Sequence, residues 1–171
     1  MAKSILSRIG CMAAIIWLAS GATDAIGQHV QAASTGWQYG ETHAYDETVR
    51  RALALLPKRP KQIVVIDTDR TPPALRQRLR RTEAFVMVGE PVVCLRMQGT
   101  VLKRARRYGG IADYVLAATI WHEMAHINGK DERGAQEQEE ALLTQFMLQR
   151  RVDTGPALRY LSLLRQRREL N

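Results

Sequence analysis

Residues 113–128 have the sequence DYVLAATIWHEMAHIN, and this stretch decides how the rest of the chain is interpreted. Apolar and small residues follow one another without a proline, as in a helix that is buried on most of its sides. Gly129 comes directly after it and suits the position just past a helix C-terminus, where the backbone commonly takes a positive φ. The sequence therefore predicts a helix over 113–128 inside the protein.

Short β-branched runs lie upstream of this helix. Residues 62–67 (QIVVID) stand between prolines and have the composition of a buried strand. Residues 85–88 and 92–95 flank Gly89-Glu90-Pro91, which predicts a β-hairpin with a three-residue turn. We expect one small sheet of about three strands.

Helical spacing dominates the remainder of the chain, and strand signals stop after Gly99. The further helices are predicted over residues 46–56, 71–81, 101–108, 133–152 and 156–168. The fold class expected from this order is α+β, with a small sheet packed on the 113–128 helix and a helical C-terminal third.

The N-terminus has the order of a secretory signal peptide. Lys3 and Arg8 precede the apolar run 9–19, which is followed by small residues up to Ala22. This run is shorter than the ~20 residues that span a membrane, so we predict a signal peptide over 1–22 and an exported protein, periplasmic or secreted. The alternative is an N-terminal membrane anchor.

The chain as a whole has the length and composition of one domain. Its 171 residues are 46% apolar and 25% charged, which is ordinary globular composition. We predict a flexible leader over 23–42 and a single domain over 43–171. Cys94 is the only cysteine after the predicted signal peptide, so it cannot form an intramolecular disulfide, and we expect it to be a small buried apolar residue.

The net charge of +8 raises the question of an anionic partner. The cations gather on two predicted helices, at Arg76, Arg78, Arg80 and Arg81, and at Lys103, Arg104, Arg106 and Arg107. Only Tyr108 lies beside them, so they lack the aromatic side chains on which bases stack, and we expect no nucleic-acid partner. We expect these cations to lie on solvated helix faces. The alternative is that they bind weakly to an anionic membrane or cell envelope.

The motif that carries chemistry is His122-Glu123-Met124-Ala125-His126, an H-E-x-x-H in the middle of the 113–128 helix. Four helical residues turn through about 400°, so both histidines project from one face, about 6 Å apart along the axis. This separation suits two ligands of one tetrahedral zinc ion. Glu123 would then serve as the general base for a water on the metal's open position.

This segment resembles the active-site helix of the zincin metallopeptidases, in particular the smallest gluzincin-type members. The resemblance covers residues 113 to about 148, with weaker support from the 84–97 hairpin. It implies zinc as the cofactor, His122 and His126 as metal ligands, Glu123 as the catalytic glutamate and peptide or protein as the substrate. It also implies that part of the hairpin is an edge strand on which an extended peptide binds.

The third ligand has three candidates. The run from Glu140 to Phe146 resembles the thermolysin-like pattern that follows a ligand glutamate, although Thr144 replaces the usual aspartate. Helical periodicity places Glu139 nearest the centre of the stripe formed by Leu142, Leu143, Phe146 and Met147, and Glu140 on its flank. A ligand that faces a water-filled cleft belongs on a flank, so we predict Glu140, with Glu139 as an alternate.

Glu132 is the other alternate, because it completes the frame H-E-x-x-H-x-x-G-x-x-E. This frame copies the metzincin spacing, with glutamate where those enzymes have histidine or aspartate. A metzincin also has a methionine-containing turn further on, whereas Met147 falls inside a predicted helix. For this reason Glu132 ranks below Glu140.

The predicted function is that of an exported zinc-dependent peptidase, which hydrolyses peptide bonds with a zinc-activated water. Tyr160 and Tyr108 are candidate donors to the oxyanion of the transition state. The alternative function is a non-catalytic, zinc-stabilised domain that binds an envelope or another surface. Structural zinc sites normally use four protein ligands, often cysteines, and only three good ligands are evident in this chain.

Overall fold

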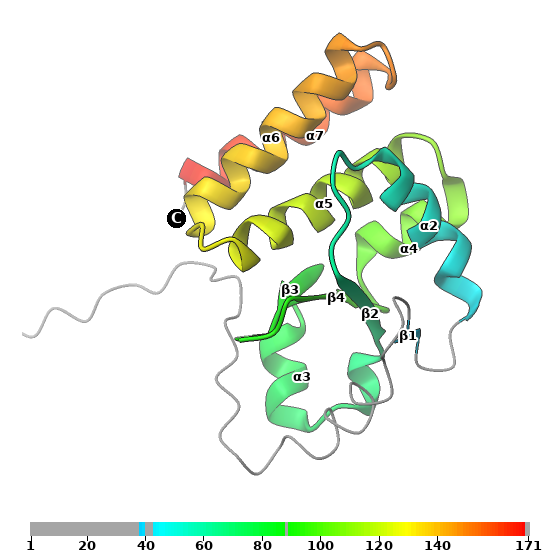
Figure 1. Cartoon of the computed structure of the whole chain (residues 1–171), viewed down its shortest axis with the longest axis vertical. Helices are drawn as coiled ribbons and strands as arrows, with labels where there is room; N and C mark the ends of the chain where they lie inside the picture. The colour runs from blue at the N-terminus through cyan, green and yellow to red at the C-terminus, as the bar shows by residue number, and fades with distance from the viewer. Residues whose placement is uncertain (1–37, 40–42, 88, 170–171) are drawn as a thin grey trace, which may run out of the picture.

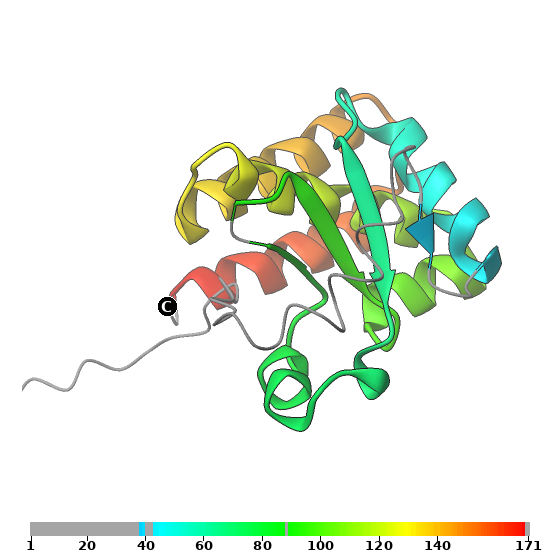
Figure 2. The same cartoon turned by 60° about the horizontal axis from the view of Figure 1, so that its bottom comes forward.

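The computed structural model describes residues 38–39, 43–87 and 89–169. Its sheet has four strands in the order β1-β2-β4-β3. These are β1 (Gln38–Tyr39), β2 (Gln62–Ile66), β3 (Ala84–Val86) and β4 (Val92–Arg96). β1, β2 and β4 are mutually parallel, and β3 is antiparallel to β4. Figure 2 shows β2 and β4 side by side in the centre of this sheet.

In the part of the chain that the structure describes, six α-helices accompany the sheet and confirm the α+β class. They are α2 (Asp46–Leu55), α3 (Pro73–Leu79), α4 (Thr100–Tyr108), α5 (Ile111–Ile127), α6 (Glu132–Leu148) and α7 (Thr154–Glu169). Each was predicted to within a few residues. Two short 3-10 turns, His43–Tyr45 and Thr68–Arg70, precede α2 and α3.

The predicted leader does not end where expected. Strand β1 lies inside the range 23–42 and pairs with β2 through Gln38 and Tyr39, so the sheet begins before residue 43. A two-residue strand carries too little periodicity to be recognised in a sequence. The predicted signal peptide over 1–22 lies outside the described residues.

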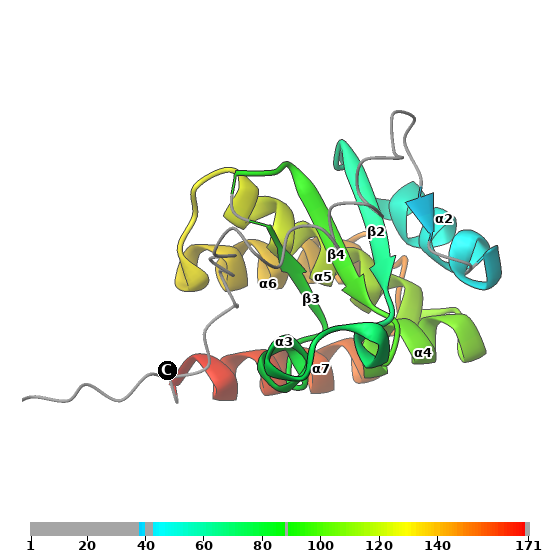
Figure 3. The same ribbon diagram turned by 90° about the horizontal axis from the view of Figure 1, so that it is seen from below.

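The two faces of the sheet bury different side chains, because alternate residues of a strand point to opposite faces. Ile63, Val65, Val93 and Leu95 pack with α2, α4 and α5. Val64, Val92 and Cys94 face the other way and pack with Leu79 of α3. Figures 1 and 3 show α3 on one side of the sheet and the other helices on the opposite side. Cys94 is fully buried and free, as predicted.

Helix α5 is the centre of the molecule. One side contributes Leu116, Ala117 and Ile120 to the core against the sheet, while Ala118 packs in a second core with α6 and α7. The helix is therefore covered on two sides, which explains its small and apolar residues. The H-E-x-x-H motif occupies its last turns, between the sheet and α6.

The start of α5 is fixed by a paired charge. Asp113 accepts hydrogen bonds from the Arg51 Nε and Nη2 atoms at 3.0 and 3.1 Å. The same guanidinium donates to the Ala105 carbonyl of α4 at 3.0 Å. Arg51 thus joins α2, α4 and α5. Its carboxylate partner raises the pKa of Arg51 despite the opposing effect of burial.

Helix α6 ends at Leu148, four residues before the predicted end at residue 152. Arg150 takes a positive φ of 53°, and the Arg151 amide donates to the Phe146 carbonyl at 2.9 Å. This closes the helix as a glycine would, without a glycine in the sequence to reveal it. None of the helices in the described part of the chain combines the length and the apolar character needed to cross a membrane.

Candidate metal centre

The last turns of α5 hold His122 and His126 side by side. Their imidazole rings lie edge to face with centroids 4.9 Å apart, and their Nε2 atoms are separated by 3.2 Å. The two histidines are four residues apart in the sequence and therefore lie on one face of the helix, as the motif requires. Their ring nitrogens are thus directed at a common point.

A tight turn then returns the chain to this point. Gly129 has a φ of +81°, and the Lys130 amide donates to the Ala125 carbonyl at 3.0 Å. Asp131 caps α6 by accepting from the Gly134 amide at 2.8 Å. Glu132 is consequently the first residue of α6 and lies over the last turn of α5.

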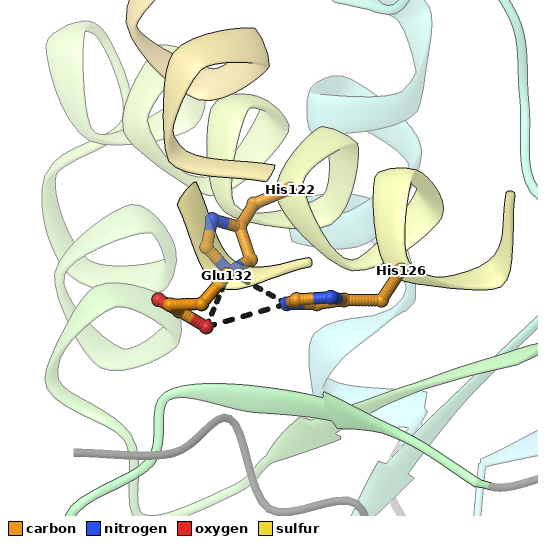
Figure 4. Close-up of side chains that lie close together, drawn as sticks. All are labelled: His122, His126 and Glu132. Atoms are coloured by element: carbon orange, nitrogen blue, oxygen red, sulfur yellow. Dashed lines mark hydrogen bonds and ion pairs between the residues drawn. The ribbon is translucent and has the colours of Figure 1, made fainter. Parts of the chain in front are cut away.

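Three donor atoms converge as a result (Figure 4). Glu132 Oε2 lies 3.4 Å from His126 Nε2 and 3.8 Å from His122 Nε2. The donor atoms of these three residues all lie within 4.8 Å of one another. Glu132 Oε2 is buried and makes no well-aligned hydrogen bond among the described residues. Its other oxygen accepts from Gln136 Nε2 at 2.7 Å.

These separations suit a small tetrahedral cation. Zinc binds nitrogen and oxygen at about 2.0–2.2 Å, so two ligands at the tetrahedral angle are about 3.3–3.5 Å apart. The three measured separations, 3.2, 3.4 and 3.8 Å, bracket this value. Two imidazoles and one carboxylate also form a donor set used by catalytic zinc sites, in which the fourth position stays open.

The outer nitrogens of both rings lie close to oxygen acceptors. His126 Nδ1 lies 2.9 Å from the Lys130 carbonyl oxygen, which can only accept, so this nitrogen carries the proton. His122 Nδ1 lies 3.1 Å from Glu139 Oε2 as an ion-pair contact, without the alignment of a hydrogen bond, and the nearby carboxylate favours a proton on this nitrogen. When both rings are neutral, the two Nε2 lone pairs and the Glu132 oxygen form a cluster of acceptors. A cation relieves the repulsion among them.

The electrostatics of the cluster favour positive charge. Burial lowers the pKa of His122, but the carboxylates of Glu132, Glu139 and Glu123 outweigh it and raise this pKa to about 10. Glu132 also raises the pKa of His126. In the opposite direction, the two imidazoles overcome the effect of burial and lower the pKa of Glu132. Without a metal, this site holds a proton tightly.

Glu123 lies beside the cluster and is only 4% exposed. Burial raises its pKa to about 7, against the lowering effect of His122 and His126. Its Oε2 atom is buried and has no hydrogen-bond partner among the described residues. A carboxylate with this pKa is suited to exchange protons near neutral pH.

The preference for Glu140 as third ligand does not agree with the structure. Its carboxylate Oε1 accepts from Arg165 Nε on α7 at 2.7 Å and also contacts Arg165 Nη2. Glu132, ranked below it, is the residue that joins the two histidines. Glu139, the other alternate, is buried behind His122 and contacts its outer nitrogen.

Two further residues of the site, Lys130 and Gln136, were missed in the sequence. Lys130 contributes only its carbonyl, so its side chain gave no signal. Gln136 follows Glu132 by four residues, and this spacing could have revealed it. Tyr160, considered as an oxyanion donor, instead donates its hydroxyl to Glu139 Oε1 at 2.9 Å. Tyr108, the other candidate donor, is 68% exposed on α4.

In comparisons with protein-family models, with curated proteins and with solved structures, no match to this chain was found.

Proposed function

We propose that this protein is a zinc-dependent peptidase of the zincin type, with His122, His126 and Glu132 as metal ligands. The observation that carries the proposal is the convergence of their three donor atoms beside a buried glutamate whose Oε2 has no hydrogen-bond partner among the described residues. A purely structural role in the core would not need this arrangement, because acceptors that converge in a buried place are unfavourable unless a cation, either a proton or a metal ion, lies among them.

Each residue has a separate task in this proposal. The two imidazoles and the Glu132 carboxylate bind the metal, and the Lys130 carbonyl and Glu139 orient the rings. Zinc at this position would supply Lewis acidity and lower the pKa of water for attack on a peptide carbonyl. Glu123 accepts the proton from the attacking water and can pass it to the leaving amine, as its raised pKa allows.

The sheet offers a place for the substrate. Strand β3 is outermost in the strand order and contacts α5, and a strand passes beside the cluster in Figure 4. An extended peptide that pairs with β3 would run along the motif helix. This supports a peptide or protein substrate that binds in extended form.

The test is hydrolysis of a denatured protein mixture by the purified chain, with a chelator and then with added zinc. We expect activity to disappear on chelation and to return with zinc. Glu123→Gln should retain zinc but lose at least ~10²-fold in activity, because the base is removed while all three ligands stay. Equal activity in wild type and Glu123→Gln would contradict the assignment of the base.

The alternative is a non-catalytic, zinc-stabilised domain that binds an envelope surface. The observation in its favour is that Lys103, Arg104, Arg106 and Arg107 of α4 are all exposed. Zinc binding without hydrolysis, combined with salt-sensitive sedimentation with anionic vesicles, would favour this function. The same assay tests the weak envelope association expected for the peptidase.

We also propose that the protein is exported, on the evidence of the signal-peptide pattern over 1–22. Protein expressed in an exporting host should be recovered outside the cytoplasm with an N-terminus within a few residues of Thr23. Soluble, full-length protein in the cytoplasm would contradict export.

A further inference from the structure

Two successive glutamates of α6 connect this helix to α7 in different ways. Glu140 is directed outward and binds Arg165 at the partly exposed edge of the helix pair. Glu139 is directed inward and is 5% exposed. Its Oε1 accepts from the Tyr160 hydroxyl at 2.9 Å, and its Oε2 lies 3.1 Å from His122 Nδ1.

The Glu139 carboxylate therefore stands between the C-terminal helix and a metal-binding imidazole. A carboxylate has two oxygens in one plane, so an interaction at one oxygen restricts the position of the other. The Tyr160 hydroxyl fixes Oε1, and this keeps Oε2 within ion-pair distance of the His122 ring nitrogen. Partners of this kind orient a ligand histidine and increase its basicity.

The packing of α7 on α6 restricts the position of the Tyr160 hydroxyl that contacts Glu139. Tyr160 borders the core that α7 shares with α5 and α6, next to the buried residues Leu161 and Leu164. The hydroxyl position is thus set by how α7 packs on α6. Any loss of the hydroxyl leaves Glu139 Oε1 buried without this donor, and the carboxylate is then free to turn away from His122.

We infer that Tyr160 is a positioning residue for the metal centre, acting through Glu139 on His122, so that the C-terminal helix sets the affinity for zinc. This inference rests on the proposed zinc site. It gives α7, none of whose described side chains is among the three candidate ligands, an indirect part in building that site.

The first experiment compares zinc affinity in the full-length chain by competition with a chelator of known affinity. Tyr160→Phe keeps the ring and should weaken zinc binding about 10-fold, within the range found when an outer partner of a ligand is removed. The matched control is Ser162→Ala, which removes a hydroxyl of the same helix that bonds only its own backbone, at Leu158. This control should bind zinc as wild type does.

The second experiment separates positioning from general destabilisation. Glu139→Ala removes both carboxylate oxygens, so that no acceptor connects Tyr160 with His122. In that background the Tyr160→Phe change should cause no further loss of zinc affinity, since the relay is already broken. In ¹⁵N-histidine spectra of the zinc-loaded Tyr160→Phe protein, the Nδ1 proton of His122 should shift while that of His126 should not.

The outcomes are distinct. A wild-type chain that binds no zinc overturns the metal centre and this inference together. A wild type that binds zinc, with Tyr160→Phe binding equally well, overturns only the role of Tyr160. Additive losses in the double variant would also overturn it, because they would show that Tyr160 acts on zinc affinity independently of Glu139.

Discussion

Glu132 supplies the only carboxylate among the three converging donors, so it would decide how well the proposed centre balances a dication. Its Oε1 is held by Gln136 and its Oε2 faces the two imidazoles. Glu140 stands two turns further along α6 and binds Arg165, whose side chain is 57% exposed. The two glutamates have the same chemistry but lie in different surroundings.

For these two residues we predict that the same substitution, glutamate to glutamine, has different effects on zinc affinity. Glu132→Gln should weaken zinc binding by more than about 100-fold, because losing an anionic ligand costs more than losing an outer partner. Glu140→Gln removes an ion pair near the surface and should leave zinc affinity unchanged, with a stability change within about 1 kcal/mol. Titration with a zinc-specific chelator measures both, and the reverse ranking would restore Glu140 as the ligand.

The turn between α5 and α6 is the element that assembles the centre. Only five residues separate His126 from Glu132, so the chain must reverse at once. Gly129 does this with a positive φ, and the carbonyl of the next residue, Lys130, orients the His126 ring. One short turn therefore places one candidate ligand, Glu132, and orients the ring of another, His126.

Gly129→Ala should lower the free energy of unfolding by about 1 kcal/mol, since a Cβ disfavours positive φ. It should weaken zinc binding as well, because the turn carries both Glu132 and the Lys130 carbonyl. Gly155→Ala is the matched control: a Cβ there meets nothing closer than Arg159 Nη1 at 3.9 Å, and no positive φ is needed. Thermal unfolding with and without zinc measures both variants, and equal effects would show that the φ of Gly129 has no special importance.

For the whole molecule, zinc would connect two layers of the fold. His122 and His126 belong to α5, which packs on the sheet, while Glu132 begins α6, which packs with α7 on the other side of α5. A bound ion would tie these layers together beside the turn that joins the end of α5 to the start of α6. Because such a site does not exist in the unfolded chain, binding adds to stability.

We predict that zinc raises the melting temperature of the wild-type chain. At a free zinc concentration 100 times the dissociation constant, the gain is about 2.7 kcal/mol. His126→Ala should abolish this gain, since two of the donor contacts pass through its Nε2. Magnesium is the control ion, because it prefers an octahedral shell of oxygen ligands and should stabilise little. A melting temperature that does not respond to zinc would contradict the metal centre.

The sequence by itself determined the α+β class, all six helices, the hairpin and the strand over 62–66, because each has a long or well-punctuated local pattern. It also placed His122, Glu123 and His126 together, since a helix fixes the relation of residues four apart. These are local properties. They depend on the backbone geometry of one segment and not on what packs against it.

Only the tertiary structure decided which glutamate joins the histidines. Counting back from Leu143 along the buried face of α6 gives Glu139, Gln136 and Glu132, spaced by four, three and four residues. This spacing could be recognised in the sequence. Which of these residues reaches the two histidines, however, depends on the turn at Gly129 and on how α6 packs across α5. The contact of Tyr160 with Glu139 joins residues 21 apart, and the edge strand β1 exists only by pairing with β2. Such relations arise between segments, where local spacing carries no information.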